Sequence, residues 1–181
     1  MKALIIAAHP DLESSRINRT LLDRVQNQPD ITVHSLYSAY PDWKIDVKRE
    51  QGLLLAHDRI VFQFPLYWYS TPPLLKKWQD DVLEYGWAFA EGGDNLKGKQ
   101  FMLATSIGVH PDCYRAGAIG EFTLSEILRP LQATAVFCQM TYLPAFITGG
   151  ELDDAQLATR ADEYLATLQT ERPRGTTLPK L

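Results

Sequence analysis

The chain has 181 residues, of which 45% are hydrophobic and 22% are charged, and its formal net charge is −4. This balance is that of an ordinary globular protein and excludes a chain that is mainly disordered. A nucleic-acid partner is also disfavoured, because such proteins need a basic stripe to displace the counterions of phosphates, and none is visible here. At ~100–200 residues per domain, we expect one domain over residues 1–170 and an irregular tail over residues 171–181.

The cysteines and the apolar runs bear on the compartment. Cys113 and Cys138 form no C-x-x-C pair, which favours two free thiols in a reducing compartment. The apolar run at the start of the chain is too short for a signal peptide, and no later run reaches the ~18 apolar residues that span a bilayer. We therefore expect a cytoplasmic protein with no direct membrane insertion and no metal site.

Short apolar runs alternate with longer amphipathic segments, which is typical of a parallel sheet covered by helices. The predicted strands are residues 3–8, 31–36, 60–65, 101–106 and 133–140, and the predicted helices are residues 15–28, 46–57, 72–83, 122–129 and 153–169. The first and third strands are almost continuously apolar, as central strands are, whereas the second alternates and suits an edge. Asp46 is a predicted helix cap, and prolines 72 and 73 suit the first turn of a helix.

This order of elements predicts an α/β fold with a five-stranded, doubly wound parallel sheet, for which 2-1-3-4-5 is one of two common strand orders. Ligands of such folds bind beyond the carboxyl ends of the strands. The loops after the first, third and fourth strands are therefore the candidate site.

The first of these loops, residues 9–18, leads into a helix. It has neither the G-x-G-x-x-G of a dinucleotide-binding turn nor a P-loop, which disfavours a nucleoside-triphosphate hydrolase. It offers polar donors at a helix start whose dipole favours an anion such as a phosphate monoester, namely His9, Ser14, Ser15, Arg16 and Asn18. The alternative is that Ser14 or Ser15 only caps the helix.

The second loop, residues 65–73, carries Tyr67, Trp68 and Tyr69 between prolines. Planar rings stack on such a surface, and the backbone N–H groups of the loop can bond ring heteroatoms. The alternative is that the aromatic side chains belong to the core, although three in succession cannot all point inward.

The third loop, residues 105–114, is long for a strand-to-helix connection, and long loops in compact domains are often functional. Its hydroxyl and amide groups would face the same ring, with His110 and Tyr114 in reach, although each alone could be an ordinary surface residue. The aromatic segment 85–93 is either a small local core or half of a pocket that a second subunit completes.

Four stretches carry a resemblance along nearly the whole chain: ALIIAAHP with SSRIN at residues 14–18, LYSAYPDWKIDVKREQ at 36–51, FPLYWYSTPPLLKKWQDDVLEYGWAF at 64–89 and LRPLQATAVFC at 128–138. With them the chain resembles the flavodoxin-like NAD(P)H:quinone oxidoreductases, most closely the small bacterial branch that includes the ancillary proteins of glutathione-regulated potassium-efflux systems. The resemblance implies the flavodoxin-like three-layer fold with strand order 2-1-3-4-5.

The resemblance also implies non-covalently bound FMN and a ping-pong cycle in which NAD(P)H gives a hydride to the flavin and a quinone then takes two electrons. The residues that it places around the phosphate and ribityl chain are His9, Ser15, Arg16, Ile17 and Asn18. Those at one edge of the ring are Leu66, Tyr67, Trp68 and Tyr69, and those at the opposite edge are Thr105, Ser106, Ile107 and Gly108. Tyr114 would donate to the reduced flavin and His110 would protonate the reduced quinone.

One departure and two alternatives qualify this expectation. Relatives often have T-T-G-G where this chain has Thr105-Ser106-Ile107-Gly108, and a β-branched residue in place of glycine predicts a narrower pocket.

Most relatives are homodimers, so we expect a dimer. The main role could instead be regulatory, through docking on the cytoplasmic domain of a potassium/proton antiporter, which would make the protein peripheral to the inner membrane. A flavodoxin-type electron carrier would need a more acidic surface.

Overall fold

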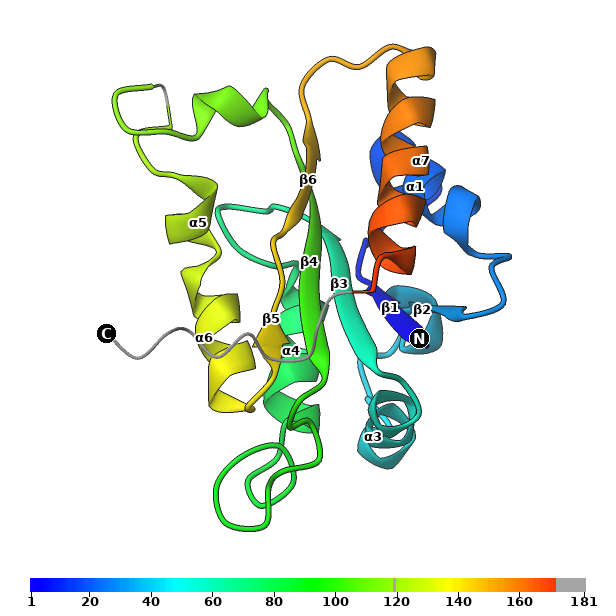
Figure 1. Ribbon diagram of the computed structural model, residues 1–181, viewed down its shortest axis with the longest axis vertical. Coiled ribbons are helices and arrows are strands. Elements are labelled where there is room, and N and C mark those ends of the chain that lie inside the picture. Colours follow the sequence, from blue (N-terminus) through cyan, green and yellow to red (C-terminus); the bar gives the residue numbers. More distant parts are fainter. Residues whose placement is uncertain (119, 172–181) are drawn as a thin grey trace.

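A computed structural model describes residues 1–118 and 120–171 of the chain. Its parallel sheet has the order β2-β1-β3-β4-β5, and β6 also pairs with β4 (Figure 1). The strands are β1 (Ala3–Ala7), β2 (Ile31–Ser35), β3 (Arg59–Pro65), β4 (Gln100–Ile107), β5 (Thr141–Tyr142) and β6 (Phe146–Gly149). The predicted fold class and strand order are confirmed, with a sixth strand added. The predicted tail lies outside the described residues except for Glu171.

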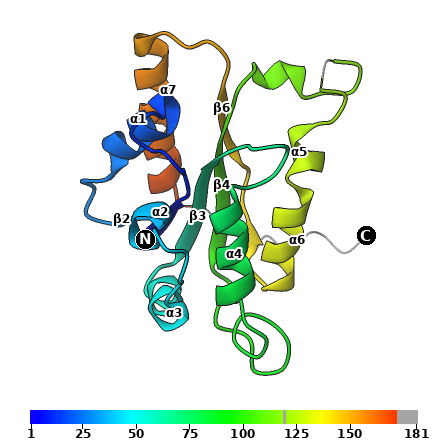
Figure 2. The same ribbon diagram turned by 180° about the vertical axis from the view of Figure 1, so that it is seen from behind.

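Helices cover both faces of the sheet (Figures 1 and 2). They are α1 (Arg16–Val25), α2 (Leu36–Ala39), α3 (Val47–Leu55), α4 (Pro73–Val82), α5 (Leu124–Ile127), α6 (Arg129–Phe137) and α7 (Asp154–Gln169), with a 3₁₀ turn η1 (Pro111–Cys113). One apolar cluster joins the sheet to α1 and α7, and the other joins it to α2, α3, α4 and α6. The central strands β1, β3 and β4 therefore bury both faces, which explains why they are almost continuously apolar.

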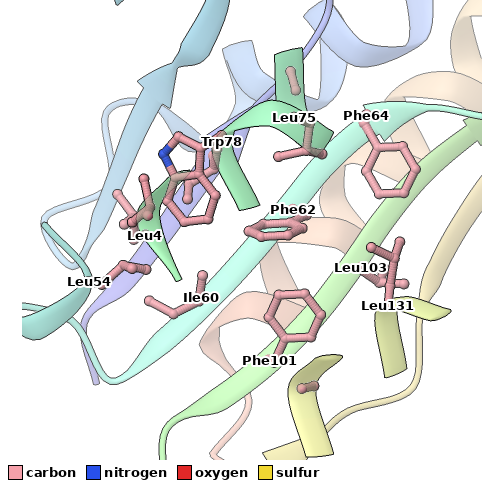
Figure 3. Packing of buried hydrophobic residues seen from close by; sticks show 14 of the residues in the cluster. Leu4, Leu54, Ile60, Phe62, Phe64, Leu75, Trp78, Phe101, Leu103 and Leu131 are labelled. Carbon is pink, nitrogen blue, oxygen red and sulfur yellow. The ribbon is translucent and has the colours of Figure 1, made fainter. Parts of the chain in front are cut away.

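The centre of the larger cluster fixes α4 against the middle of the sheet (Figure 3). Trp78 on α4 is 1% exposed, and its ring meets Phe62 of β3 edge to face with the centroids 5.5 Å apart. Phe62 meets Phe101 of β4 in the same way at 4.8 Å. Edge-to-face pairs are worth about 0.5–1.5 kcal/mol beyond their buried area. This packing sets the position of the loop between β3 and α4.

The prediction of a strand at residues 133–140 is wrong, because residues 133–137 lie in α6, Cys138 is its C-cap, and residues 139–140 belong to no strand. The buried side chains Leu131, Ala135 and Cys138 recur at helical spacing, and Phe137 between them is exposed. Pro130 starts this helix in its first turn instead of ending the preceding one. A short apolar run can be a strand or a helix, and only the spacing of its buried positions distinguishes them.

The fifth strand position is instead filled by two short strands. β5 pairs with Gln100 and Phe101 at the start of β4, and β6 pairs with residues 104–107 at its end. Residues 143–145, which include Pro144, separate the two. Proline lacks the N–H that a ladder requires, so the edge is interrupted there.

Within residues 1–118 and 120–171, every helix falls short of the length and apolar character needed to cross a membrane. Cys113 and Cys138 are both free thiols, as expected.

Candidate functional site

The three predicted loops meet at one end of the sheet. Residues 7, 63 and 104 lie side by side on β1, β3 and β4, and Pro65 pairs with Ser106. The Leu66 N–H then donates to the Ser106 carbonyl at 2.8 Å. Parallel pairing thus brings together loops that are far apart in the sequence.

The first loop both caps α1 and leaves donors free. Ser15 is the N-cap, and its Oγ accepts from the backbone N–H of Asn18 at 3.4 Å and from Asn18 Nδ2 at 3.1 Å. Because that oxygen accepts twice, its own hydrogen can point elsewhere. The N–H groups of Arg16 and Ile17 donate to no atom of the described part of the chain. Capping and anion binding are therefore compatible at this helix start.

The buried residue Asn18, with 2% of its surface exposed, links the start of α1 to the end of β4 through hydrogen bonds. Its Nδ2 donates to Ser106 Oγ at 2.9 Å as well as to Ser15 Oγ, and Gln63 Nε2 donates to the Asn18 carbonyl at 3.0 Å. We call Ser15, Asn18, Gln63 and Ser106 the Asn18 cluster. Since both Nδ2 hydrogens are used within the protein, this side chain orients its neighbours.

His9 presents a neutral N–H donor. Its Nδ1 accepts from the Asp11 N–H at 3.1 Å, so Nε2 carries the proton in the neutral ring. Burial lowers the pKa of His9, and this effect exceeds the opposing hydrogen bond and negative charge of Asp11. The ring also meets Tyr67 edge to face at 6.4 Å. His9 thus lies between the first and second loops.

The Arg16 side chain points toward α7. Its Nη1 donates to the Leu152 carbonyl and its Nη2 to Asp154 Oδ1, both at 2.7 Å. The guanidinium is half exposed, and its partners lie at the start of α7. Ile17 packs partly against the apolar cluster under α1 and α7. In this conformation both side chains are engaged within the protein, whereas the backbone N–H groups of both residues are free of partners among the described residues.

The second loop is a strained aromatic turn. Tyr67 and Ser70 bond each other through N–H to carbonyl contacts of 3.0 and 2.9 Å, and Trp68 and Tyr69 between them have φ of 47° and 63°. Left-handed backbone at both central positions corresponds to a type I′ turn, which usually carries glycine or asparagine. Residues 67–70 are called the aromatic turn from here on.

The aromatic side chains of this turn lie at the surface. Tyr67 is 42% exposed, Trp68 92% and Tyr69 55%, whereas Leu66 packs against the core. The N–H groups of Trp68 and Tyr69 donate to no atom of the described residues. The core interpretation of these aromatics is therefore wrong, and the turn offers flat rings with free backbone donors.

The end of β4 forms the side of the candidate site opposite the aromatic turn. Thr105 is buried and its hydroxyl has no partner among the described residues, Ser106 belongs to the Asn18 cluster, and Gly108 is exposed. Ile107 is 4% exposed and fills space beside Gly149, where a Cβ atom would come within 2.2 Å of Ile107 Cγ1. The side chain at 107 is thus accommodated by a glycine on the adjacent strand. The narrower pocket expected from Ile107 stays a prediction.

His110 and Tyr114 follow on the third loop. His110 is exposed, and its Nδ1 accepts from the Asp112 N–H at 3.3 Å, which caps η1. Partial burial raises the pKa of the Tyr114 phenol, with smaller contributions from Tyr69 and Cys113. Tyr114 therefore lies near the aromatic turn.

The segment after β6 also contributes to the candidate site, and its contribution was not predicted from the sequence. Gly149 makes room for Ile107, Gly150 lies against His110, and Leu152 and Asp154 hold Arg16. Gly149 and Gly150 are a sequence signal that could have indicated this segment. Because the fifth strand was predicted at residues 133–140, the two glycines were not recognised as the end of a strand.

The donor set suits a phosphate monoester joined to a planar ring. Free N–H groups, the Ser15 hydroxyl and the His9 N–H gather at the start of α1, and the exposed aromatic turn lies on the neighbouring strand. FMN has both parts, so the residues present fit it. No group of three or more His, Cys, Asp or Glu side chains suited to a metal ion occurs within residues 1–118 and 120–171.

Comparison with known proteins identifies the family. The family described as "Flavodoxin-like fold" matches residues 1–169, and the chain belongs to it. It is 50% identical over 170 residues to the uncharacterized NAD(P)H oxidoreductase YrkL of Bacillus subtilis, covering 91% of this chain and 98% of that one. It is 41% identical over 176 residues to the glutathione-regulated potassium-efflux system ancillary protein KefG of an Enterobacter species, covering 96% of each.

Solved structures agree on the fold. A protein described as a thermophilic tryptophan halogenase from Streptomycin violaceusniger has a TM-score of 0.91 and 47% identity, over 93% of this chain and 99% of that one. General stress protein 14 of Treponema denticola, solved in complex with FMN, has a TM-score of 0.88 and 43% identity, over 93% and 98%. An NADPH-quinone reductase from P. pentosaceus has a TM-score of 0.88 and 34% identity, over 95% and 100%.

Proposed function

We propose that the protein is an FMN-dependent NAD(P)H:quinone oxidoreductase that transfers a hydride from NAD(P)H by way of FMN to a quinone. The observation that carries the proposal is the pairing of free donors at the start of α1 with the aromatic turn on the next loop. The names of the NAD(P)H oxidoreductase, the FMN complex and the quinone reductase among its relatives support it.

The phosphate end would be held at α1. The N–H groups of Arg16 and Ile17, the Ser15 hydroxyl and the His9 N–H would donate to the phosphate, where the helix dipole adds a favourable field. Asn18 would fix Ser15 and Ser106 in place. When bound, FMN supplies the two-electron chemistry, and the protein supplies position and electrostatics.

The ring would lie between the second and third loops. The aromatic turn and Leu66 would hold one edge, with the free N–H groups of Trp68 and Tyr69 as donors, and residues 105–108 would hold the other. Tyr114 would keep its proton over the physiological range, because its pKa is raised, and could donate to the side of the ring where negative charge accumulates. The exposed His110 would give a proton to the reduced quinone.

A visible spectrum of the purified protein tests the reaction class. After addition of FMN and removal of the excess, we expect flavin bands that bleach with NADH or NADPH and return with a quinone. Rates with the two dinucleotides give the preference between them. Tryptophan and halide in the same assay test the chemistry named for one structural neighbour. A protein that retains no flavin would overturn the proposal.

Two further variants separate the catalytic roles. Replacing His110 with Gln should slow quinone reduction about 10²-fold or more while flavin reduction is kept, because general acid catalysis contributes about that factor. Tyr114→Phe should slow flavin reduction instead. Equal effects on both half-reactions would contradict this division.

We also propose a homodimer. Phe89 and Phe137 meet at 5.1 Å on the surface over α4 and α6, and Tyr85, Val136 and Phe137 are 74%, 62% and 66% exposed. Two neighbouring hollows lie between α4 and α6, and Lys76, Gln79 and Thr134 line both of them. A second copy would cover this apolar surface. Phe137→Glu should yield monomers in sedimentation, and an unchanged dimer would contradict this interface.

The second candidate function is regulation of a potassium-efflux antiporter, and the KefG relatives favour it. The cytoplasmic domain of the antiporter encoded nearest to this gene would then bind the protein and activate efflux. Potassium efflux measured in cells with and without this gene tests that role. A variant that keeps antiporter activation but lacks redox activity would make the enzyme activity secondary.

A further inference from the structure

A fully buried carboxylate lies outside the residues assigned so far. Glu50 on α3 is 0% exposed. Its Oε1 accepts from the Tyr40 hydroxyl at 2.5 Å and faces His34 Nε2 at 3.0 Å, and its Oε2 accepts from the Trp78 indole N–H at 2.8 Å. One side chain therefore joins α3 to β2, to the end of α2 and to α4.

This carboxylate is held in its charged form. Burial raises the pKa of Glu50, but the hydrogen bonds from His34, Tyr40 and Trp78 outweigh burial and lower it. Burial and the bond to Glu50 raise the pKa of Tyr40 to about 12, so its hydroxyl remains a donor. A buried charge is tolerated only when its donors are well placed, so the network fixes the relative positions of the elements that supply them.

Two of those elements support the aromatic turn. Tyr37 lies on α2 one turn before Tyr40, and its hydroxyl accepts from the Leu74 N–H in the first turn of α4 at 3.4 Å. Burial raises the pKa of the Tyr37 phenol, and the bond from the Leu74 N–H lowers it by less. The Tyr37 ring also meets Trp43 edge to face at 6.3 Å. The start of α4, which follows the aromatic turn in the chain, is therefore bonded to α2.

The turn itself needs such support. Trp68 and Tyr69 both have left-handed backbone, which is unfavourable for residues other than glycine. Strained conformations persist only where the surrounding structure determines them. The side chain of Trp68 is 92% exposed and contributes little packing of its own.

We propose that Glu50 is a positioning residue for the aromatic turn, acting through Tyr40 at the C-cap of α2, through Tyr37 on α2 and through Trp78 on α4. The inference rests on the proposed FMN site. In a Glu50→Gln variant, one oxygen remains an acceptor, while the amide nitrogen cannot accept from Tyr40 or Trp78. At least one buried donor then loses its partner, and the connection that Glu50 makes between α2 and α4 is weakened.

The test compares FMN binding by the full-length wild-type protein and Glu50→Gln, well below the unfolding temperature of both. We expect the dissociation constant for FMN to rise about tenfold, as for the loss of one charge-assisted hydrogen bond. The visible circular dichroism of bound FMN should also change, because it reports the surroundings of the ring. Tyr40→Phe removes one donor with little change in shape and should change the same signal in the same direction.

Leu168→Ala is the matched control. Leu168 is 2% exposed, and it belongs to the apolar cluster under α1 and α7, on the other face of the sheet. This variant should unfold at a lower temperature but bind FMN with the wild-type constant and dichroism.

The outcomes are distinct. If the wild-type protein binds no FMN, the proposed function fails and the inference fails with it. If it binds FMN, and Glu50→Gln and Tyr40→Phe differ from it only in unfolding temperature, the network is merely structural and the inference alone is overturned. Should Glu50→Gln not fold, Tyr40→Phe decides the question alone.

Discussion

The Asn18 cluster, which joins the start of α1 to β3 and β4, and the aromatic turn after β3 are built in opposite ways. In the cluster, Asn18 is buried and its donors are all used within the protein. In the turn, aromatic rings are exposed, backbone donors are free, and two residues have unfavourable φ. The first is held by its own hydrogen bonds, whereas the second depends on helices behind it.

This difference suggests two separate tasks in binding. A helix start fixed by buried hydrogen bonds needs no rearrangement to receive an anion, which lowers the entropic cost of binding. An exposed, strained turn gains most when a ring covers it. Substitutions in the cluster should therefore change both stability and affinity, and substitutions in the turn should move the two in opposite directions.

Asn18 gives the largest expected effect. Asn18→Leu removes the amide that donates to Ser15 and Ser106 and should lower the free energy of unfolding by about 2–4 kcal/mol in a denaturant titration. Asn18→Asp keeps the shape and adds a charge beside the proposed phosphate, so FMN affinity should fall about 100-fold, since nearby unit charges interact by several kcal/mol. Unchanged affinity in Asn18→Asp would mean that the first loop is only a capped helix start.

The support behind the turn should show in acid stability. Glu50→Gln should cost about 1–3 kcal/mol at neutral pH because a buried donor loses its partner. The folded pKa of Glu50 is lowered, so its stabilisation is present above its ordinary pKa of 4.5 and is lost as the pH falls through the folded pKa. The stability difference between wild type and variant should therefore shrink below pH 4.5, as measured by urea unfolding across that range. A constant difference would contradict a charged Glu50.

In the aromatic turn itself, a substitution should raise stability and lower FMN affinity. Tyr69→Gly removes a side chain from a residue with φ of 63° and should raise the free energy of unfolding by about 1 kcal/mol. The same change should weaken FMN binding, since a ring-facing aromatic is lost. Ser70→Ala, next in the chain, is the control without a strained φ. If Tyr69→Gly lowers stability, the left-handed turn is not strained.

The smallest effect concerns Arg16. Arg16→Ala and Asp154→Asn each break the same exposed ion pair and should change stability by less than about 1 kcal/mol. If the backbone N–H of Arg16 holds the phosphate, both variants should bind FMN alike. A loss of affinity in Arg16→Ala alone would show that the guanidinium leaves Asp154 for the phosphate.

The first four strand positions follow from local sequence because each is a continuous or alternating apolar run. Asp46 is a helix cap as predicted, since its short side chain accepts from the Arg49 N–H. The fifth strand could not be found in this way, because β5 and β6 have two and four residues and an apolar helix precedes them.

The candidate loops were predictable from topology, but their internal order was not. Asn18 meets Ser106 and Ile107 meets Gly149 across long sequence separations, and such pairs depend on strand register. Glu50 lies within residues 36–51, one of the stretches that carry the family resemblance. A single sequence, however, does not indicate that His34, Tyr40 and Trp78 all contact it.

The interruption at Pro144 has a consequence for solubility. A sheet edge with a long row of unpaired N–H and carbonyl groups can recruit strands from other molecules. Here one border is the five-residue β2, and the opposite border is divided between a two-residue and a four-residue strand with proline in the gap. The border of β5 and β6 therefore offers only short, divided templates for intermolecular strand addition, which disfavours growth into fibres from that side of the sheet.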